Sequence, residues 1–258
     1  MNVLTARVAF RDRSTIDVFD LSLRFLVVHG AAYAKVAAVV ALPSAVVATA
    51  AGYAFGWTFG WVVAIFLFFA GQVPFTLLAS RLVFETNVTT KSVLKSALSE
   101  TPRIMVMRVG WAIAMAAGIL LFVVPGLWAA GSLHFMSEVM LLERATVGAA
   151  FGRSQRVASA SLGESLAGAS IGLLVIVAAV VLAEIGGRAL ISDLLELRPP
   201  ASAWALGGSA LTMVGLFAIA PYAATARFFT YLNVRTRVEG WDIQTRFAAL
   251  VARASVDA

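Results

Sequence analysis

The chain has 258 residues, of which 60% are hydrophobic and 13% are charged, and its mean hydropathy is +0.89. Soluble domains carry about 25% charged residues, so this composition excludes an ordinary soluble protein and predicts one compact membrane domain over residues 1–258. The net charge of +6 does not indicate nucleic-acid binding, because Lys and Arg flank apolar segments, where they orient membrane helices. The chain has no cysteine, which excludes disulfides and thiol chemistry.

Long apolar segments predict six membrane spans, since a helix needs about 20 apolar residues to cross a bilayer. We expect these spans at residues 31–51, 58–83, 102–124, 126–142, 162–185 and 203–226. Pro43 is expected to kink the first span. The sequence Pro125-Gly126 predicts a tight turn, so the third and fourth spans should form an antiparallel hairpin. No cleaved signal peptide is expected, because the first residues include no apolar core.

Four short segments have the pattern of amphipathic helices: 14–27, 90–99, 146–159 and 241–253. In the first, Ser14 and Asp17 fit a capping box, and Ile16 and Phe19 share an apolar face. We expect these helices to lie at the cytoplasmic head groups; for the first one, the alternative is that it forms the initial turns of the first span. A short helix precedes a helical hairpin three times, which indicates a threefold internal repeat, with true duplication left open. The predicted fold class is therefore an all-α polytopic bundle.

The distribution of basic residues predicts the orientation. With six spans, 18 of the 20 Lys and Arg residues lie on the side of the termini, and only Arg188 and Arg198 lie on the other. This bias places both termini in the cytoplasm, with the protein in the bacterial inner membrane. Tryptophans at membrane interfaces act as anchors. The outer belt is expected to contain Trp57, Trp61, Trp128 and Trp204, and Trp241 is expected on the cytoplasmic side.

Sequence patterns of catalysis and metal binding are not found. The two histidines, His29 and His134, lie far apart in the predicted topology, and there is no HExxH motif or cysteine cluster. No GxSxG motif, P-loop or dinucleotide fingerprint occurs in a suitable context. We therefore expect no enzyme activity, no catalytic residue, no cofactor and no metal.

Two charged residues fall inside predicted spans. Arg108 lies six residues into the third span, and Glu138 lies about four residues before the end of the fourth. The predicted hairpin puts the two at depths that differ by only about 3 Å. Since an unpaired charge inside a membrane is costly, we expect Arg108 and Glu138 to pair. The alternative is that each reaches lipid phosphate or water separately.

Two further polar residues, Gln72 and His134, are candidates for a polar path through the bilayer. Intramembrane polar and ionisable residues usually face a bundle interior or a water-filled route. His134 is flanked by Ser132 and Ser137, and a proton or substrate route would use such a residue. The alternative is that nearby hydroxyls and carbonyls satisfy the imidazole.

Small residues at intervals of four allow close helix packing in lipid. They occur in the third and fifth spans at Gly110, Ala114, Gly118, Gly168 and Gly172. They indicate either a dimer interface or packing within one subunit.

Three stretches carry a family resemblance: VVPGLW at 123–128, LLERATVGAAFGRSQRV at 141–157 and YLNVRTRVEGWDIQTRFAAL at 231–250. In these the chain resembles bacterial multipass proteins of the glycerophosphodiester phosphodiesterase membrane-domain type. The resemblance implies six membrane helices with interfacial helices. It does not imply phosphodiesterase activity, because in that family this chemistry belongs to a separate soluble catalytic domain.

These patterns favour a non-enzymatic membrane protein that acts as an organising or accessory subunit, linked to lipid or envelope handling. The alternative function is a transporter or channel with its path near His134 and Gln72. The expected partners are membrane lipids, with anionic head groups on the cytoplasmic side, and either a membrane-protein partner or a second copy of the chain. Nucleic acid is not expected as a partner.

Overall fold

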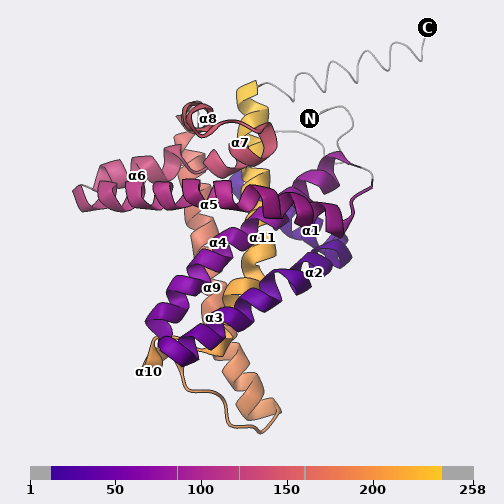
Figure 1. Ribbon diagram of the computed structural model, residues 1–258, viewed down its shortest axis with the longest axis vertical. Helices are drawn as coiled ribbons and strands as arrows, with labels where there is room; N and C mark the ends of the chain where they lie inside the picture. The colour runs from indigo at the N-terminus through magenta and orange to yellow at the C-terminus, as the bar shows by residue number, and fades with distance from the viewer. Residues whose placement is uncertain (1–12, 86, 122, 160, 240–258) are drawn as a thin grey trace.

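The computed structural model describes residues 13–85, 87–121, 123–159 and 161–239, and every regular element in these ranges is a helix (Figure 1). This confirms the predicted all-helical fold. Five helices, rather than the predicted six, are long and apolar enough to cross a membrane, which suits a multipass membrane protein. They cover Gly30–Phe55, Trp57–Phe84, Thr90–Leu120, Leu162–Leu194 and Ala210–Val238.

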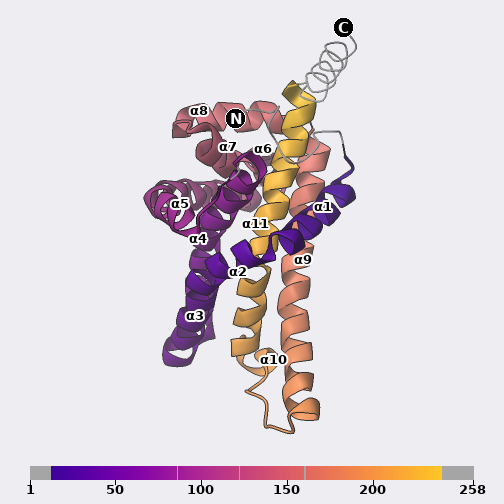
Figure 2. The same ribbon diagram turned by 90° about the vertical axis from the view of Figure 1, so that its right-hand side faces the viewer.

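The long axis of the molecule follows α9 (Leu162–Ala189) and α11 (Ala210–Glu239), which run side by side in both side views (Figures 1 and 2). The two helices are antiparallel, because Gly168 of α9 lies against Thr230 of α11 and Gly187 of α9 lies against Leu211 of α11. A five-residue π-helical turn, Leu190–Leu194, extends α9. The chain then returns through the short α10 (Ala203–Leu206), which ends at Gly207 with φ +80°. The last span therefore begins at Ala210 rather than at residue 203.

A second hairpin packs against this pair. It consists of α2 (Gly30–Val39) with α3 (Ala41–Phe55), followed by α4 (Trp57–Phe84). α2 and α3 are separated at Val40, where we expected Pro43 to bend the first span, and the bend is visible in Figure 2. Gly56 adopts φ +91° at the turn. A Cβ on Gly60 would lie 2.8 Å from the Cα of Gly52, so two glycines allow the backbones of α3 and α4 to touch.

The first amphipathic segment forms α1 (Thr15–Val28). Ser14 caps it, as predicted, by accepting a hydrogen bond from the Asp17 N–H at 3.2 Å. The Asp17 carboxylate accepts from the Ser14 hydroxyl at 2.8 Å rather than from the Ser14 backbone N–H that a capping box uses. Phe19 packs into the core, and its carbonyl accepts a hydrogen bond from the Tyr222 hydroxyl of α11. The expected apolar face is divided, because Ile16 is 74% exposed. α1 therefore has apolar residues on the core side and on the outer side.

The middle of the chain differs most from the prediction. Residues 90–99 and the third span form one continuous helix, α5 (Thr90–Leu121), so the second of the three expected short helices is not separate. The expected fourth span, 126–142, is divided into α6 (Val123–Ser132) and α7 (Met136–Glu143), and neither is a candidate span. α8 (Val147–Ser159) is a separate helix, as predicted. The segment 241–253 lies outside the described residues.

Candidate functional site

The most buried charged group of the fold is Glu138, at the start of α7. Its side chain is inaccessible to solvent. Arg227 of α11 forms an ion pair with it: Nη2 donates to Oε2 at 3.1 Å, and Nε lies 2.9 Å from Oε1 without hydrogen-bond geometry. Hydrogen bonds between ionised groups are stronger than those between neutral groups. This ion pair therefore fixes the position of α7 against α11.

Ser137 and the irregular backbone before α7 complete the surroundings of this pair. The Ser137 hydroxyl donates to Oε2 of Glu138 at 2.9 Å and accepts from Nη2 of Arg227. Nη2 of Arg227 also donates to the backbone carbonyl of His134 at 3.0 Å. That carbonyl is near the arginine because the chain interrupts its helix between Ser132 and Met136. The break that removes the predicted fourth span thus supplies a hydrogen-bond acceptor to the cluster.

Arg108 joins the same cluster indirectly. Its guanidinium is buried, donates to the backbone carbonyl of Phe69 on α4, and reaches the Ser137 hydroxyl at 3.5 Å. It also lies 5.6 Å from the centre of the Phe69 ring. Among the described residues, the direct ion pair of Glu138 is with Arg227, and Ser137 lies between Glu138 and Arg108. The expected direct pair is thus replaced by a bridged one.

This difference has a physical cause. The depth comparison of Arg108 with Glu138 treats 126–142 as one straight helix, but α6 and α7 are separate and change direction at residues 133–135. Arg227 appears in the sequence only as one of several basic residues at a helix exit. In the structure α11 stays helical to Glu239, which places Arg227 beside α7. We refer to Arg108, Ser137, Glu138 and Arg227 as the charge cluster.

The two residues of the predicted polar path are both near this region but are not joined to each other. Gln72 is buried on α4, and its side-chain oxygen has no hydrogen-bond partner. The His134 ring packs against Phe135, with 5.0 Å between ring centres. His134 lies between α6 and α7, outside the five candidate spans, where burial and the charge of Arg227 lower its pKa to about 3. Its ring is therefore neutral at physiological pH.

A second charged group at the other end of α7 was not foreseen from the sequence. Glu143 pairs with Arg153 of α8 and with Arg235 of α11, the latter at 3.3 Å, and accepts a hydrogen bond from the Tyr231 hydroxyl at 2.5 Å. Arg227, Tyr231 and Arg235 follow each other at intervals of four along one face of α11. That spacing is a helix-face signal that could have predicted a charged interface.

A third buried carboxylate, Glu184 of α9, lies at the opposite end of the molecule. It accepts hydrogen bonds from the Ser209 hydroxyl and, at 2.9 Å, from the Ala203 backbone N–H, and Arg188 lies 3.8 Å away. The sequence conceals Glu184 because it is the one acidic residue near the end of an otherwise apolar span. Its position explains how the segment between α9 and α11 is anchored.

Replacing Glu184 with alanine is expected to loosen that segment, because it leaves the Ala203 N–H and the Ser209 hydroxyl without their acceptor. An unsatisfied buried polar group costs about 1–3 kcal/mol. The measurement is limited proteolysis of residues 195–209 together with the thermal unfolding midpoint. Glu196→Ala, an exposed acidic residue of the same segment, is the matched control and should leave both unchanged. Equal protease sensitivity of the two variants would contradict the anchoring role.

The glycines expected at helix contacts occupy different environments. Gly168 faces Thr230 of α11, whereas a Cβ on Gly110 or Gly172 would have no described atom within 4 Å. Ala114 is exposed and Gly118 is partly buried. Gly168 therefore packs within the subunit, and Gly110 and Gly172 are open toward whatever surrounds the chain.

Three of the four tryptophans predicted for the outer belt gather at one end. The Trp57 ring lies over Gly52 and Gly208, Trp61 donates to the Gly207 carbonyl at 2.8 Å, and Trp204 is exposed on α10. Trp128 does not join them, because α6 lies toward the other end of the molecule (Figure 1). Trp241 lies outside the described residues.

The side chains of these sites join helices through ion pairs and hydrogen bonds. In the described ranges, no three His, Cys, Asp or Glu residues are placed to hold a metal ion. Ser137 beside Glu138 has the composition of a hydroxyl with its base, but both side chains are fully buried and the carboxylate is occupied by Arg227. A substrate would have to displace the helix contacts to reach them.

Comparisons with known proteins add no further assignment. No family model matches the chain, and neither a curated protein nor a solved structure matches it. The resemblance to the glycerophosphodiester phosphodiesterase membrane-domain type accordingly stays a prediction.

Proposed function

We propose that the chain is a non-enzymatic integral membrane protein of the bacterial inner membrane, acting as an organising or accessory subunit in lipid or envelope handling. One observation carries this proposal. The charge cluster, in which Arg108 and Glu138 are buried, is engaged in helix–helix contacts. Glu138 is fully buried and forms an ion pair with Arg227, whose Nη2 donates to its Oε2. Residues fixed in this way stabilise one arrangement of helices.

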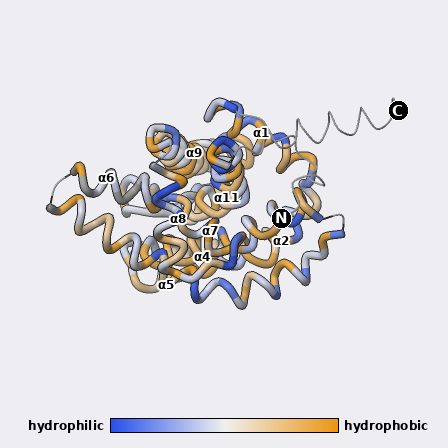
Figure 3. The backbone as a smooth tube through the Cα atoms, turned by 90° about the horizontal axis from the view of Figure 1, so that it is seen from above, coloured by the Kyte–Doolittle hydropathy of each residue, from blue (hydrophilic) through white to orange (hydrophobic). Residues whose placement is uncertain are grey.

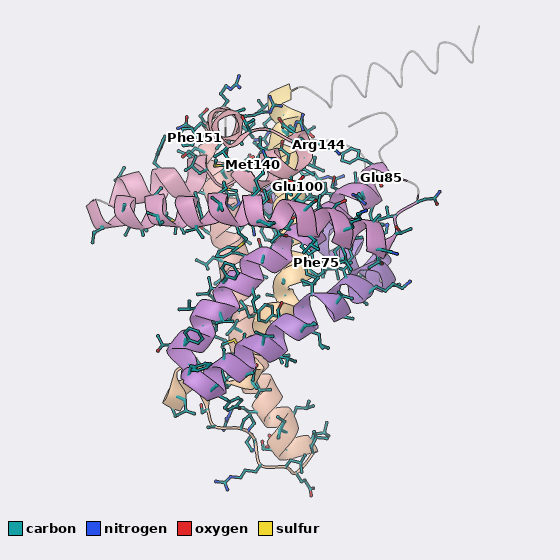
Figure 4. All side chains as sticks on the ribbon, in the orientation of Figure 1. Phe75, Glu85, Glu100, Met140, Arg144 and Phe151 are labelled. Carbon is teal, nitrogen blue, oxygen red and sulfur yellow. The ribbon has the colours of Figure 1, made fainter. Side chains whose placement is uncertain are left out.

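The orientation belongs to the same proposal. Both termini are cytoplasmic, as the 18 to 2 distribution of Lys and Arg indicates. Figure 4 shows the labelled residues Glu85, Glu100 and Arg144 on the same half of the molecule as Met140 and Phe151. Basic residues on this side favour anionic lipid by about 1 kcal/mol each near the surface. Anionic lipid is therefore the proposed partner of that face.

A transporter is the second candidate function, and two specific atoms favour it. The Nε of Arg108 and the side-chain oxygen of Gln72 are buried without a hydrogen-bond partner, and the charge cluster has two guanidinium groups for one carboxylate. Against it, the neutral ring of His134 is unsuited to carry protons, and the apolar groove between α3 and α11 contains no member of the cluster. That groove has a volume of about 380 Å³ and is lined by Leu42, Ala45, Val46, Thr49, Ala50, Tyr53, Ala210 and Val214.

Reconstitution distinguishes the two functions. Purified protein in liposomes loaded with a pH-sensitive or anion-sensitive dye is expected to leak no faster than empty liposomes, and Gln72→Ala and His134→Ala should change nothing. In parallel, the tagged chain extracted from its own membranes in lipid nanodiscs should retain a membrane partner in fixed stoichiometry. A flux above that of empty liposomes that falls in either variant would replace the accessory role by the transport role.

A further inference from the structure

We propose that the α5–α6 hairpin does not cross the membrane but lies in the plane of the cytoplasmic leaflet, with lipid acyl chains as its partner. This inference depends on the membrane placement of α9 and α11 and not on the accessory role. In Figure 1, α9 and α11 run along the long axis while α5 and α6 run across it, and Figure 2 shows α5 nearly end-on. If α9 and α11 cross the bilayer, α5 lies roughly parallel to its surface.

The level of the hairpin along α11 points to the cytoplasmic side. Arg108, at its root, contacts Ser137, which contacts Arg227 of α11. Arg227 is 17 residues from Ala210, the first residue of α11, which corresponds to about 26 Å of helix. The hydrocarbon core is about 30 Å thick, so a span that enters near Ala210 reaches Arg227 close to the opposite boundary. The root of the hairpin is therefore at the cytoplasmic edge of the core.

The return helix is also too short to cross. α6 has 10 residues, Val123–Ser132, which gives a length of about 15 Å, half of the hydrocarbon thickness. The chain then breaks its helix and enters α7, whose Glu138 pairs with α11 near the level of the root. Both ends of the hairpin thus lie on the same side of the membrane. Four segments then cross the bilayer: α2 with α3 as one span, α4, α9 and α11.

The surface of the hairpin requires an apolar environment. No Asp, Glu, Lys or Arg occurs between Arg108 and Glu138. Ile113 is 64% exposed, Leu120 is 88% exposed and Val124 is 74% exposed. Seen from above, the α5–α6 arm extends away from the remaining helices and is coloured mainly orange and white (Figure 3). A helix that is apolar on all sides needs an apolar environment on every side and is not stable with one face in water. This arm therefore belongs within the leaflet rather than in the cytoplasm.

Two features fit a shallow position in that leaflet. The tip is tightly closed, because a Cβ on Gly126 would lie 2.9 Å from the backbone nitrogen of Ile119. At the other end of α5, Lys91 and Lys95 are exposed, where they can contact anionic head groups.

The test uses the full-length chain, which has no cysteine of its own, with one cysteine introduced at a time. Leu120→Cys probes the tip of the hairpin. Asp193→Cys probes the segment after α9, and Lys95→Cys probes the first turns of α5. In intact cells a membrane-impermeant maleimide is expected to label Asp193→Cys and to leave Leu120→Cys and Lys95→Cys at background. Labelling of Leu120→Cys from outside would show that the hairpin crosses the membrane and would overturn the proposal.

A second measurement identifies what covers the tip. A fluorophore attached to Leu120→Cys, in liposomes that contain brominated phospholipid, should lose most of its fluorescence, and more with bromine near the head group than near the chain end. The same fluorophore on Lys95→Cys should be quenched less. Absence of lipid quenching at Leu120→Cys would overturn the proposal. If the unlabelled Leu120→Cys chain then formed a disulfide-linked dimer on oxidation, a second copy of the chain would cover the tip; if it formed no dimer, water would.

Discussion

Replacing Arg227 with methionine is expected to lower the free energy of unfolding by about 3–5 kcal/mol, the range found when one partner of a buried ion pair is removed. The expected loss is large because Glu138 is fully buried and would keep its charge without the guanidinium that contacts both of its oxygens. Ser137 would stay as a neighbouring donor, but one hydroxyl does not compensate a buried carboxylate. The measurement is denaturant or thermal unfolding of the purified protein in mixed micelles.

The second variant of this series separates lost charge pairing from lost packing. In the double variant Arg227→Met with Glu138→Gln, the buried carboxylate is neutral and Arg108 keeps its hydrogen bond to the Phe69 carbonyl, so part of the stability should return. The matched control is Arg24→Ala, because Arg24 pairs with Asp20 at 2.9 Å on the exposed surface of α1. Exposed pairs contribute about 0–1 kcal/mol. A double variant less stable than Arg227→Met alone would contradict the ion-pair explanation.

The helical membrane character follows from the sequence because it depends on long apolar runs. Three of the predicted spans match helices within a few residues: 31–51 with α2 and α3, 58–83 with α4, and 162–185 with α9. The hairpin of α5 and α6 was also predicted, but its turn was expected at Pro125-Gly126, and these two residues lie within α6. The direction of the hairpin was not predicted, because apolar residues are equally suited to a helix that crosses the bilayer and one that lies within a leaflet.

The basic residues illustrate why the span count could not be settled by charge. Arg81 and Lys91 precede the α5–α6 hairpin, and Arg144 and Arg153 follow it. Whether the hairpin crosses twice or not at all, all four lie on the same side. The ratio of 18 to 2 is therefore identical for six crossings and for four. Counting basic residues on each side detects an error in the number of spans only when that error is odd.

The charge cluster was predicted in part for a related reason. Intramembrane cost alone identifies Arg108 and Glu138 as residues that need partners. It does not identify Arg227, because an arginine near a helix exit is satisfied by head groups in most membrane proteins. The pairing is decided by the long continuous α11 and by the break at residues 133–135, and both are tertiary features.

A close contact between α9 and α11 is at Gly215 on α11, which the search for small residues in the third and fifth spans did not include. A Cβ there would lie 2.6 Å from the Ala183 Cβ and 2.7 Å from the Ala179 carbonyl oxygen of α9. Both distances are shorter than a normal van der Waals contact, and the second involves a backbone oxygen, which cannot rotate away. Gly215→Ala must therefore move α9 and α11 apart.

Gly215→Ala is expected to destabilise the protein by about 1–3 kcal/mol, the usual cost of overpacking, measured as the unfolding midpoint in micelles. Gly172→Ala on α9 is the matched control, since its Cβ would have no described atom within 4 Å, and it should stay within about 0.5 kcal/mol of the unmodified chain. Adding Ala183→Gly to Gly215→Ala removes the side-chain clash and leaves the clash with the Ala179 carbonyl. The rescue should consequently be partial, whereas complete rescue would show that the two backbones are not in contact at this point.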